Sequence, residues 1–509
     1  MIGLTNAINL TGINVVTKSK SLLRLAQPAE LQKIKTPREP QLPKIATEGL
    51  KGALSQCNRP PKQLQHEADV LYEKILQRRF PASKEVMLTA RSTILKKMKE
   101  SGMEKLDENV YGSKINKAHT DYLNAKVGKL LRQSNYSWKA LDFENREKAA
   151  TYALGMLSSH FSEIYRVLCE FNTNEFVPET VLDFGSGIGS SFWACNEKFG
   201  NAVKEYTLVD VNPIISQFSM DIMRSNKDNN VFIHPNVNFR RSLVPSLQIK
   251  YDLVIAHRSL IEFANKETRL ELIKSLWQRT NKYLIIIESH MEDSFNAILE
   301  ARDYILEEGK KVDFSKIKEV FDKYGIFDEE IQNVLENNLI SDFEKYYLLK
   351  AKLPKDAVVP TMLESGYVYA PCPHDQQCPK KSIVNTKKST CTFSIKYRDI
   401  RADGKPSKLR NGTGNTAFSY IILEKGDRPI GKEFYPRLIK LSKGNKHFTC
   451  QSCTLYNGLQ HYVISKKNKH FYQQTKGLNH GDKIPYKIIV EKKLSENDVL
   501  YDDLLNLDE

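Results

Sequence analysis

Val181-Leu182-Asp183-Phe184-Gly185-Ser186-Gly187-Ile188-Gly189 predicts an apolar strand that runs into a turn with three closely spaced glycines. Glycine allows a sharp backbone turn and lets a ligand approach with no side chain in the way. We expect a helix to begin at Ser190, with its free N–H groups directed at that ligand. A second apolar strand, 206–209, ends in Asp210, from which a carboxylate can hold ribose hydroxyls. The pattern predicts a nucleotide site at the edge of an α/β sheet.

Two ligands fit such a site, a dinucleotide and S-adenosylmethionine. The acidic Asp183 inside the turn would repel a pyrophosphate, but it suits the ammonium or sulfonium group of S-adenosylmethionine. We therefore predict S-adenosylmethionine as the ligand. The expected binding residues are Asp183, Gly185, Ser186, Gly187, Gly189 and Asp210.

Strands and helices alternate in the sequence around this turn. Further strands are predicted at 251–256 and 283–288, helices at 214–223 and 266–280, and a closing hairpin from 393–397 and 417–425. The apolar runs are continuous, which indicates strands buried on both faces, as in a parallel sheet. We expect a Rossmann-like class I methyltransferase fold, an α/β fold whose ligand lies at the C-terminal strand ends, near Asp210, His257 and Glu288.

The remaining sequence suggests five parts. They are a mitochondrial presequence (1–36), an N-terminal helical region (37–172), the methyltransferase-like domain (173–427) with a helical insertion (308–362) and a cysteine-bearing loop (370–391), a basic β-rich C-terminal domain (428–493) and an acidic tail (494–509). Residues 1–29 contain no acid and several bases among Leu, Ile, Ser and Thr, as presequences do. A disordered basic N-terminus is the alternative.

Charge is unevenly distributed over the 509 residues, whose formal net charge is +15. Between Lys380 and Lys493, 25 Lys or Arg face only 7 Asp or Glu. A basic region of this length favours a polyanion as partner. No apolar run reaches the length of a membrane span, so none is expected.

Five of the 8 cysteines fall between Cys372 and Cys453. Such a concentration, with Cys372 and Cys378 next to prolines, indicates a metal site. Four thiolates can hold a tetrahedral zinc ion or an iron–sulfur cluster, and the neighbouring prolines favour the cluster. His374 is a possible further ligand, although we expect it to face solvent.

Several separated blocks of the chain resemble one family, the mitochondrial ribosome assembly proteins called ribosomal small-subunit mitochondrial protein 22 or methyltransferase-like protein 17. The resemblance covers about residues 145–485, and its most specific block is Ala370-Pro371-Cys372-Pro373-His374 followed by Cys378-Pro379; others are 182–189, 251–254, 418–421 and Tyr435-Pro436-Arg437. It implies a [4Fe–4S] cluster on Cys372, Cys378, Cys391 and either Cys450 or Cys453, of which we favour Cys453. It also implies binding to small-subunit rRNA in the mitochondrial matrix, among the proteins and assembly factors of the small ribosomal subunit.

No recognised catalytic device accompanies the expected cofactor site. The position after the fourth strand, Ala256-His257-Arg258-Ser259, lacks the Pro-Pro-aromatic motif of amino-group methyltransferases and a cysteine nucleophile. His257 could act as a general base, but a hydrogen-bonded or RNA-facing role is expected. The leading hypothesis is an rRNA-binding assembly factor or component of the mitochondrial small subunit, required for mitochondrial translation. The alternative is an active rRNA methyltransferase.

Overall fold

The computed structural model describes most of the chain. The described residues are 22–26, 38–102, 108–134, 136–137, 141, 143–224, 231–354, 357–381, 390–405, 412–429 and 434–491. The expected acidic tail and most of the expected presequence lie outside them. Inside that presequence, β1 (Leu22–Ala26) forms a strand that pairs antiparallel with β13 (Lys487–Glu491).

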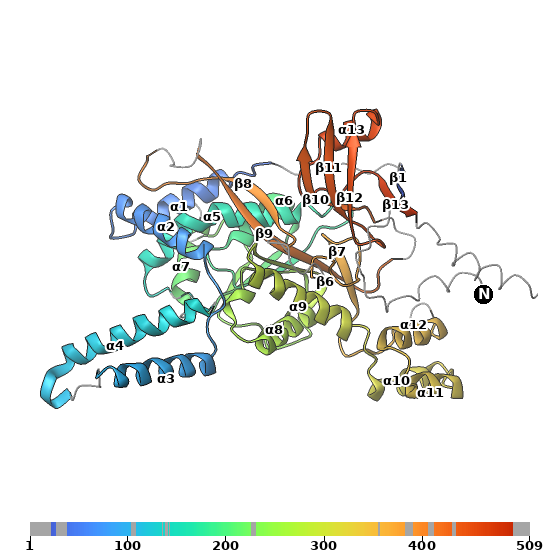
Figure 1. Cartoon of the computed structure of the whole chain (residues 1–509), viewed down its shortest axis with the longest axis horizontal. Helices are drawn as coiled ribbons and strands as arrows, with labels where there is room; N and C mark the ends of the chain where they lie inside the picture. The colour runs from blue at the N-terminus through green and yellow to red at the C-terminus, as the bar shows by residue number, and fades with distance from the viewer. Residues whose placement is uncertain are drawn as a thin grey trace, which may run out of the picture.

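The centre of the molecule is an eight-stranded sheet, visible in Figure 1, with the strand order β4-β3-β2-β5-β6-β9-β7 and β8 paired with β9. Its strands are β2 (Thr180–Phe184), β3 (Glu205–Val209), β4 (Val237–Arg240), β5 (Tyr251–His257), β6 (Thr280–Ser289), β7 (Gly366–Ala370), β8 (Phe393–Arg398) and β9 (Thr413–Lys425). The strands β4 to β6 are parallel, and β9 lies antiparallel between β6 and β7. This order confirms the Rossmann-like methyltransferase fold.

Both faces of the inner parallel strands β2, β3, β5 and β6 are buried, as their apolar runs predicted, whereas the edge strand β4 is partly exposed. Side chains alternate across a strand, so Leu253 and Ile255 of β5 enter one core cluster while Val254 and Ala256 enter another. The first cluster packs under α5 (Arg146–Leu168), α6 (Ser190–Phe199) and α7 (Pro213–Met223). The second packs under α8 (Lys266–Arg279) and α9 (Glu292–Glu308).

The sheet closes through the predicted hairpin and through one strand that was not predicted. The hairpin strands β8 and β9 pair antiparallel, and β9 also pairs with β6. The short β7 pairs with the end of β9. Because β7 and β8 adjoin the same strand, the loop between them, which carries three of the clustered cysteines, begins and ends beside β9.

Helical elements precede and interrupt the sheet. α1 (Lys44–Ser55) packs against α7, and α2 (Pro61–Leu76) packs against α5. α3 (Lys84–Glu100) and α4 (Glu108–Gln133) form a hairpin that projects from the body in Figure 1. The insertion forms α10 (Phe314–Lys323), α11 (Glu329–Glu336) and α12 (Asp342–Lys352) around a small core of its own. None of the helices in the described ranges is long and apolar enough to cross a membrane.

A smaller β structure follows the main sheet. β10 (Arg437–Lys443), β11 (His447–Cys453) and β12 (Leu459–Ser465) form an antiparallel three-stranded sheet. α13 (Lys469–Lys476) and β13 complete this part, which we call the C-terminal lobe (437–491), and β1 pairs with β13 at its edge. Phe448, Tyr462, Ile464 and Tyr486 lie in its core. The sequence predicted a basic β-rich domain here, over 428–493.

Candidate functional site

The glycine turn after β2 has a left-handed backbone conformation that glycine adopts readily. Gly185, Gly187 and Gly189 all have positive φ angles, of 72°, 50° and 77°. This region is costly for residues with a Cβ atom. A Cβ on Gly185 would lie 2.2 Å from Ser259 Oγ, and one on Gly189 would lie 2.1 Å from Met223 Cε. Side chains therefore already cover two of the three glycines, whereas a Cβ on Gly187 would meet nothing closer than 3.9 Å.

Asp183 lies beneath this turn with a carboxylate that lacks a hydrogen bond of normal geometry. Its side chain is 1% exposed, and neither carboxylate oxygen has a hydrogen-bond partner within ordinary limits. Burial raises its pKa to about 7, an effect that the nearby Ser191 hydroxyl opposes and the charge of Asp210 reinforces. A buried, unpaired carboxylate is costly unless a donor or cation reaches it. Asp183 thus fits a ligand that carries an ammonium group.

Asp210 stands at the end of β3, on the other side of the turn. Its Oδ2 accepts a hydrogen bond from Gly187 N at 2.9 Å, and its Oδ1 accepts one from Asn212 N at 2.9 Å. Each carboxylate oxygen has a second lone pair, so both can still accept hydroxyl hydrogen bonds. The predicted residues Asp183, Gly185, Ser186, Gly187, Gly189 and Asp210 are therefore brought together around one turn.

The strand end of β5 carries an ion cluster centred on Glu163, a fully buried residue of α5. Glu163 interacts with His257 Nε2 at 2.9 Å, accepts from Arg258 Nη2 at 2.6 Å and from Nε at 3.1 Å, and accepts from Thr416. Burial opposes ionisation of Glu163, but Arg258 and His257 outweigh it and hold its pKa well below the ordinary value. Burial lowers the pKa of His257. Glu163 therefore fixes the orientation of both side chains, and His257 could exchange a proton only through its other ring nitrogen, Nδ1.

Glu288 ends the next strand, β6, and its role is structural in part. It is fully buried, and its Oε1 accepts a hydrogen bond from Leu260 N at 2.7 Å, while Oε2 has no partner. Burial raises its pKa to about 7. This carboxylate fixes the short turn η2 (Leu260–Glu262) beside the Arg258 cluster.

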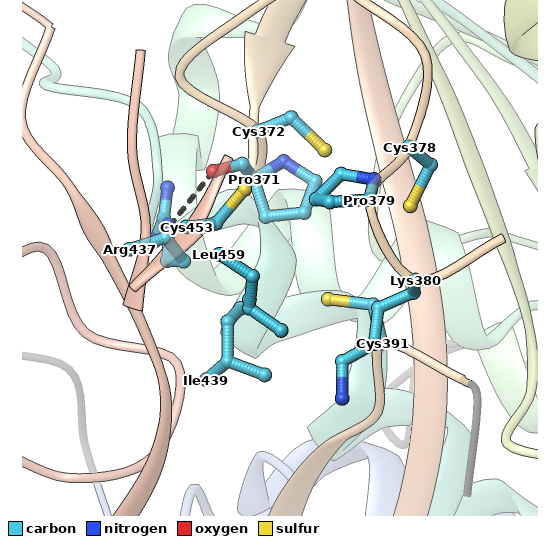
Figure 2. A pocket seen from close by; sticks show the side chains of 10 residues that line it. All are labelled: Pro371, Cys372, Cys378, Pro379, Lys380, Cys391, Arg437, Ile439, Cys453 and Leu459. Atoms are coloured by element: carbon cyan, nitrogen blue, oxygen red, sulfur yellow. Dashed lines mark hydrogen bonds between the residues drawn. The ribbon is translucent and has the colours of Figure 1, made fainter. Parts of the chain in front are cut away.

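Four cysteines line one small, partly open cavity at the contact between the main sheet and the C-terminal lobe, shown in Figure 2. Cys372 and Cys378 lie in the loop after β7, Cys391 precedes β8, and Cys453 ends β11. The other lining residues are Pro371, Pro379, Lys380, Arg437, Ile439 and Leu459. The donors are thus all thiols, in an apolar wall with two cationic residues and no acid.

The structure separates Cys453 from Cys450, the two residues between which the resemblance left a choice. They lie three positions apart on β11 and so point to opposite faces of the sheet. Cys453 lines the cavity, whereas Cys450 is 1% exposed in the core of the C-terminal lobe. The expectation that His374 faces solvent is wrong. Its ring is 3% exposed, with Nε2 3.2 Å from Cys453 Sγ and Nδ1 3.1 Å from Gln376 O.

Arginines hold the cysteine loop in place. Arg437 Nε donates to Pro371 O at 2.9 Å, and its two terminal nitrogens bind the Glu170 carboxylate at 2.9 Å. Arg428 binds Asp375 in a two-pronged ion pair at 2.7 Å, and the buried Arg302 donates to Gln376 O. The sequence reasoning assigned no role to these residues, although Arg437 stands in one of the family-like blocks. Their partners are remote in sequence and adjacent only in the fold.

Burial and mutual repulsion determine the state of the four thiols. Burial raises the pKa of Cys372 to about 11 and raises the pKa values of Cys378, Cys391 and Cys453. In the absence of a cation all four are neutral thiols at pH 7. Within the described ranges, no three His, Cys, Asp or Glu side chains are gathered in a way that could hold a single metal ion.

Fold and cavity together define a methyltransferase-like protein with a cysteine-lined cavity at the contact with a basic C-terminal lobe. A family model described as mitochondrial small ribosomal subunit Rsm22 matches residues 146–314 and 355–485. The chain belongs to this family, as the resemblance predicted. The matched residues include the glycine turn and all four cavity cysteines, but not the α3–α4 hairpin or most of the insertion.

Individual relatives agree with this membership. The human protein "Ribosome assembly protein METTL17, mitochondrial" is 25% identical over 368 residues, which are 71% of this chain and 68% of the human protein. The "Rsm22-cox11 tandem protein 2, mitochondrial" of Schizosaccharomyces pombe is 20% identical over 287 residues, 53% of this chain and 31% of that protein.

Solved structures similar to part of the chain are methyltransferases. Human N-acetylserotonin methyltransferase in complex with SAM matches 28% of this chain and 39% of its own, with 16% identity and a TM-score of 0.23. The 16S rRNA methylase ArmA matches 33% of this chain and 77% of its own, with 15% identity and a TM-score of 0.21.

Proposed function

We propose that this protein is an assembly factor or component of the mitochondrial small ribosomal subunit, located in the matrix, where it binds small-subunit rRNA and supports mitochondrial translation. In this proposal the cysteine cavity holds a [4Fe–4S] cluster on Cys372, Cys378, Cys391 and Cys453. The cluster fastens the basic C-terminal lobe to the methyltransferase-like domain. Family membership supports the ribosomal role.

The position of the cavity is the observation that carries the proposal. Three thiols belong to the loop between β7 and β8, and the fourth belongs to the C-terminal lobe. A group bound to all four would join the two parts. The lobe carries ten Lys or Arg between Arg437 and Glu491 against two Asp or Glu, and many of them are exposed. Such a surface suits phosphate contacts that position the protein on RNA.

The donor set suits an iron–sulfur cluster. Cysteine thiolates are the usual ligands of [4Fe–4S] clusters, and hydrophobic surroundings exclude solvent from them. Proline and aliphatic side chains provide such surroundings here. A zinc ion, the alternative, requires four thiolates about 2.3 Å from one centre, and the described side chains are not gathered in that way. Bound, the cluster supplies positive charge that keeps the four thiols deprotonated.

The glycine turn supports ligand binding more than methyl transfer. Asp183 offers an unpaired buried carboxylate to the ammonium group of S-adenosylmethionine, and Asp210 retains acceptor capacity for ribose hydroxyls. At the end of β5, where a methyl acceptor would lie, Glu163 forms ion pairs with His257 and Arg258. We infer that S-adenosylmethionine, where bound, stabilises the folded state by mass action. Isotope-labelled methyl transfer to small-subunit rRNA, abolished in Asp183→Ala, would instead establish an enzyme.

A matched pair of variants on β11 tests the cluster. The protein is purified without oxygen as wild type, Cys453→Ala and Cys450→Ala, and its iron, sulfide, zinc and sulfur-to-iron charge-transfer absorption are measured. We expect Cys453→Ala to lose most of its iron. Cys450→Ala should keep it, because that side chain points to the opposite face. Colourless wild-type protein with stoichiometric zinc would contradict the cluster assignment.

RNA binding is measured on the same samples. We expect the affinity of the wild type for small-subunit rRNA to fall steeply with salt, as phosphate contacts require. Cys453→Ala should bind more weakly because its lobe is no longer fastened. Salt-independent binding of the wild type would exclude phosphate contacts as the basis of recognition.

A further inference from the structure

The α3–α4 hairpin is a second basic surface, separate from the C-terminal lobe. It precedes the part of the chain that the family model matches. In Figure 1 it extends away from the body as two adjacent helices. A helix of 26 residues, the length of α4, is about 39 Å long. No function assigned so far uses this arm.

The arm has a core of its own and a fixed base. Apolar residues of the two helices face one another and are buried: Ala90, Ile94 and Met98 from α3, and Leu123, Val127 and Leu131 from α4. At the base, Ala82 N donates to Ser137 O at 3.1 Å and Ser137 N donates to Phe80 O at 2.7 Å. Ion pairs of Arg78 with Glu262 and of Arg79 with Asp293 tie this base to the methyltransferase-like domain. The arm is therefore an ordered extension.

Its charge is strongly one-sided. Each of the two helices contains five Lys or Arg and only two Asp or Glu. Lys96, Lys126 and Lys129 are exposed and form none of the ion pairs found in the described part of the structure. The insertion provides a comparison within the same chain, since α10, α11 and α12 together carry six basic and seven acidic residues. The positive excess of the arm is therefore not shared by the other solvent-exposed helices of the insertion.

Basic residues and a few apolar residues share the outward faces of the arm. Helical spacing places Lys84, Leu88, Arg91, Leu95 and Lys99 on one face of α3, and Tyr122, Lys126 and Lys129 on one face of α4. Leu88, Leu95 and Tyr122 are 59%, 46% and 40% exposed. Lysines spaced along a rigid helix can follow a line of phosphates.

We propose that the α3–α4 hairpin is a second RNA-contacting arm, which lies along the sugar–phosphate backbone of structured RNA. The identity of that RNA rests on the proposed function, but the arm itself is separate from the cysteine cavity. Charge complementarity selects this partner, because the positive excess on both helices matches a polyanion better than a protein surface of mixed charge. Such a contact recognises the phosphate backbone and the shape of the RNA. It does not recognise base sequence, because lysine contacts to phosphates do not distinguish one base from another.

The test uses the full-length protein and two variants with equal loss of charge. One is Lys96→Gln/Lys126→Gln/Lys129→Gln in the arm, and the control is Lys316→Gln/Lys318→Gln/Lys323→Gln on α10. Binding to fragments of small-subunit rRNA is measured over a series of salt concentrations. Each phosphate contact contributes about 0.7 to 0.9 to the slope of log affinity against log salt. We expect the arm variant to reduce that slope by about 2 and the affinity by about tenfold at low salt, while the control changes neither.

The remaining outcomes separate the arm from the rest of the proposal. The arm variant, the control and the wild type could all show the same steep salt dependence. That result would refute the RNA-contacting role of the arm and leave the proposed function intact. A wild type without salt-dependent RNA binding would remove the proposed function itself. An arm variant that binds naked RNA normally but loses assembling particles would show a protein partner and overturn the RNA assignment. Circular dichroism spectra equal to wild type exclude misfolding, which exposed substitutions should not cause.

Discussion

At the scale of single residues, burial keeps the Asp183 carboxylate near its point of half-ionisation at neutral pH. Its pKa rises from 3.8 to about 7 because the side chain is buried, which outweighs the nearby Ser191 hydroxyl. The folded state therefore holds a proton that the unfolded state has already lost above pH 4. Stability contributed by this proton is complete below pH 3.8 and disappears as the pH rises through 7. A cationic ligand should reverse this loss.

Asp183→Asn, which cannot ionise, should therefore be more stable than wild type at high pH. A pKa displaced by one corresponds to about 1.4 kcal/mol, so the gain at pH 8 should not exceed about 4 kcal/mol. At pH 4 the two proteins should be nearly equal. Denaturant unfolding at pH 4, 6 and 8 measures this difference. The same variant should lose binding of S-adenosylmethionine in calorimetry. A pH-independent difference would mean that Asp183 is paired in solution.

At the residue scale, the sequence correctly placed residues near one another where they are close in the chain, while their role in binding S-adenosylmethionine stays a prediction. The acid and glycines of the turn follow one another within nine positions, and a turn of that type constrains each of them. Glu163 was not recognised, because its partners His257 and Arg258 are more than ninety positions away in the sequence. An acid within the apolar stripe of α5 was the available signal. The prediction that His374 faces solvent was wrong for a similar reason, because the C-terminal lobe that buries this residue comes much later in the chain.

At the scale of elements, the loop between β7 and β8 depends on Arg437. This arginine joins Glu170 of the segment after α5, Pro371 of the loop and Gly481 of the C-terminal lobe. Removal of one partner from a buried ion pair leaves the other charge uncompensated. The pairing is fully buried, with 3% and 4% of the two side chains exposed.

Arg437→Met should accordingly destabilise the protein by about 3 kcal/mol, near the lower end of the range for buried pairs. Arg59→Met is the matched control, because the Arg59–Glu67 pair is far more accessible, with 36% and 29% of the two side chains exposed, and its loss should cost no more than about 1 kcal/mol. Chemical unfolding of both variants gives the comparison. Equal effects would show that Tyr420 and Arg166, which also contact Glu170, are sufficient to hold it.

Element-scale prediction was good for long apolar segments and poor for short ones. The strands β5 and β6 have runs of Leu, Ile and Val that only a buried strand accommodates in this context. The strand β7, with five residues between a turn and a proline, carries no comparable pattern. The arm helices α3 and α4 fell within the predicted N-terminal helical region, but their sequence did not indicate that they project from it.

At the scale of the whole molecule, the cysteine cavity connects two parts that otherwise have separate cores. The C-terminal lobe has its own apolar cluster, distinct from those of the main sheet. If the proposed cluster fastens the lobe, its removal should loosen the attachment while both cores remain folded. Local opening of this kind raises amide exchange in one contiguous unit.

Hydrogen exchange of protein with and without bound iron tests this expectation. Peptides covering β10–β12 and the loop 371–378 should exchange at least several-fold faster without iron, whereas β2 and β5 should not change. Cys450→Ala with iron bound serves as the control, because it alters the lobe without altering the cavity. Uniform acceleration over the whole chain would indicate global destabilisation and contradict the role of a local fastener.

The spacing of the cavity cysteines also has a consequence for biogenesis. Eighty-one positions separate Cys372 from Cys453, and the strands β8, β9 and β10 lie between them in the chain. A chain that has not yet reached Cys453 offers three of these sulfurs at most, so loading of the proposed cluster could be completed only on a chain that includes β11. On the proposed function, iron supply would then act as a checkpoint on finished molecules, and a cell short of iron would accumulate full-length protein that is ribosome-incompetent.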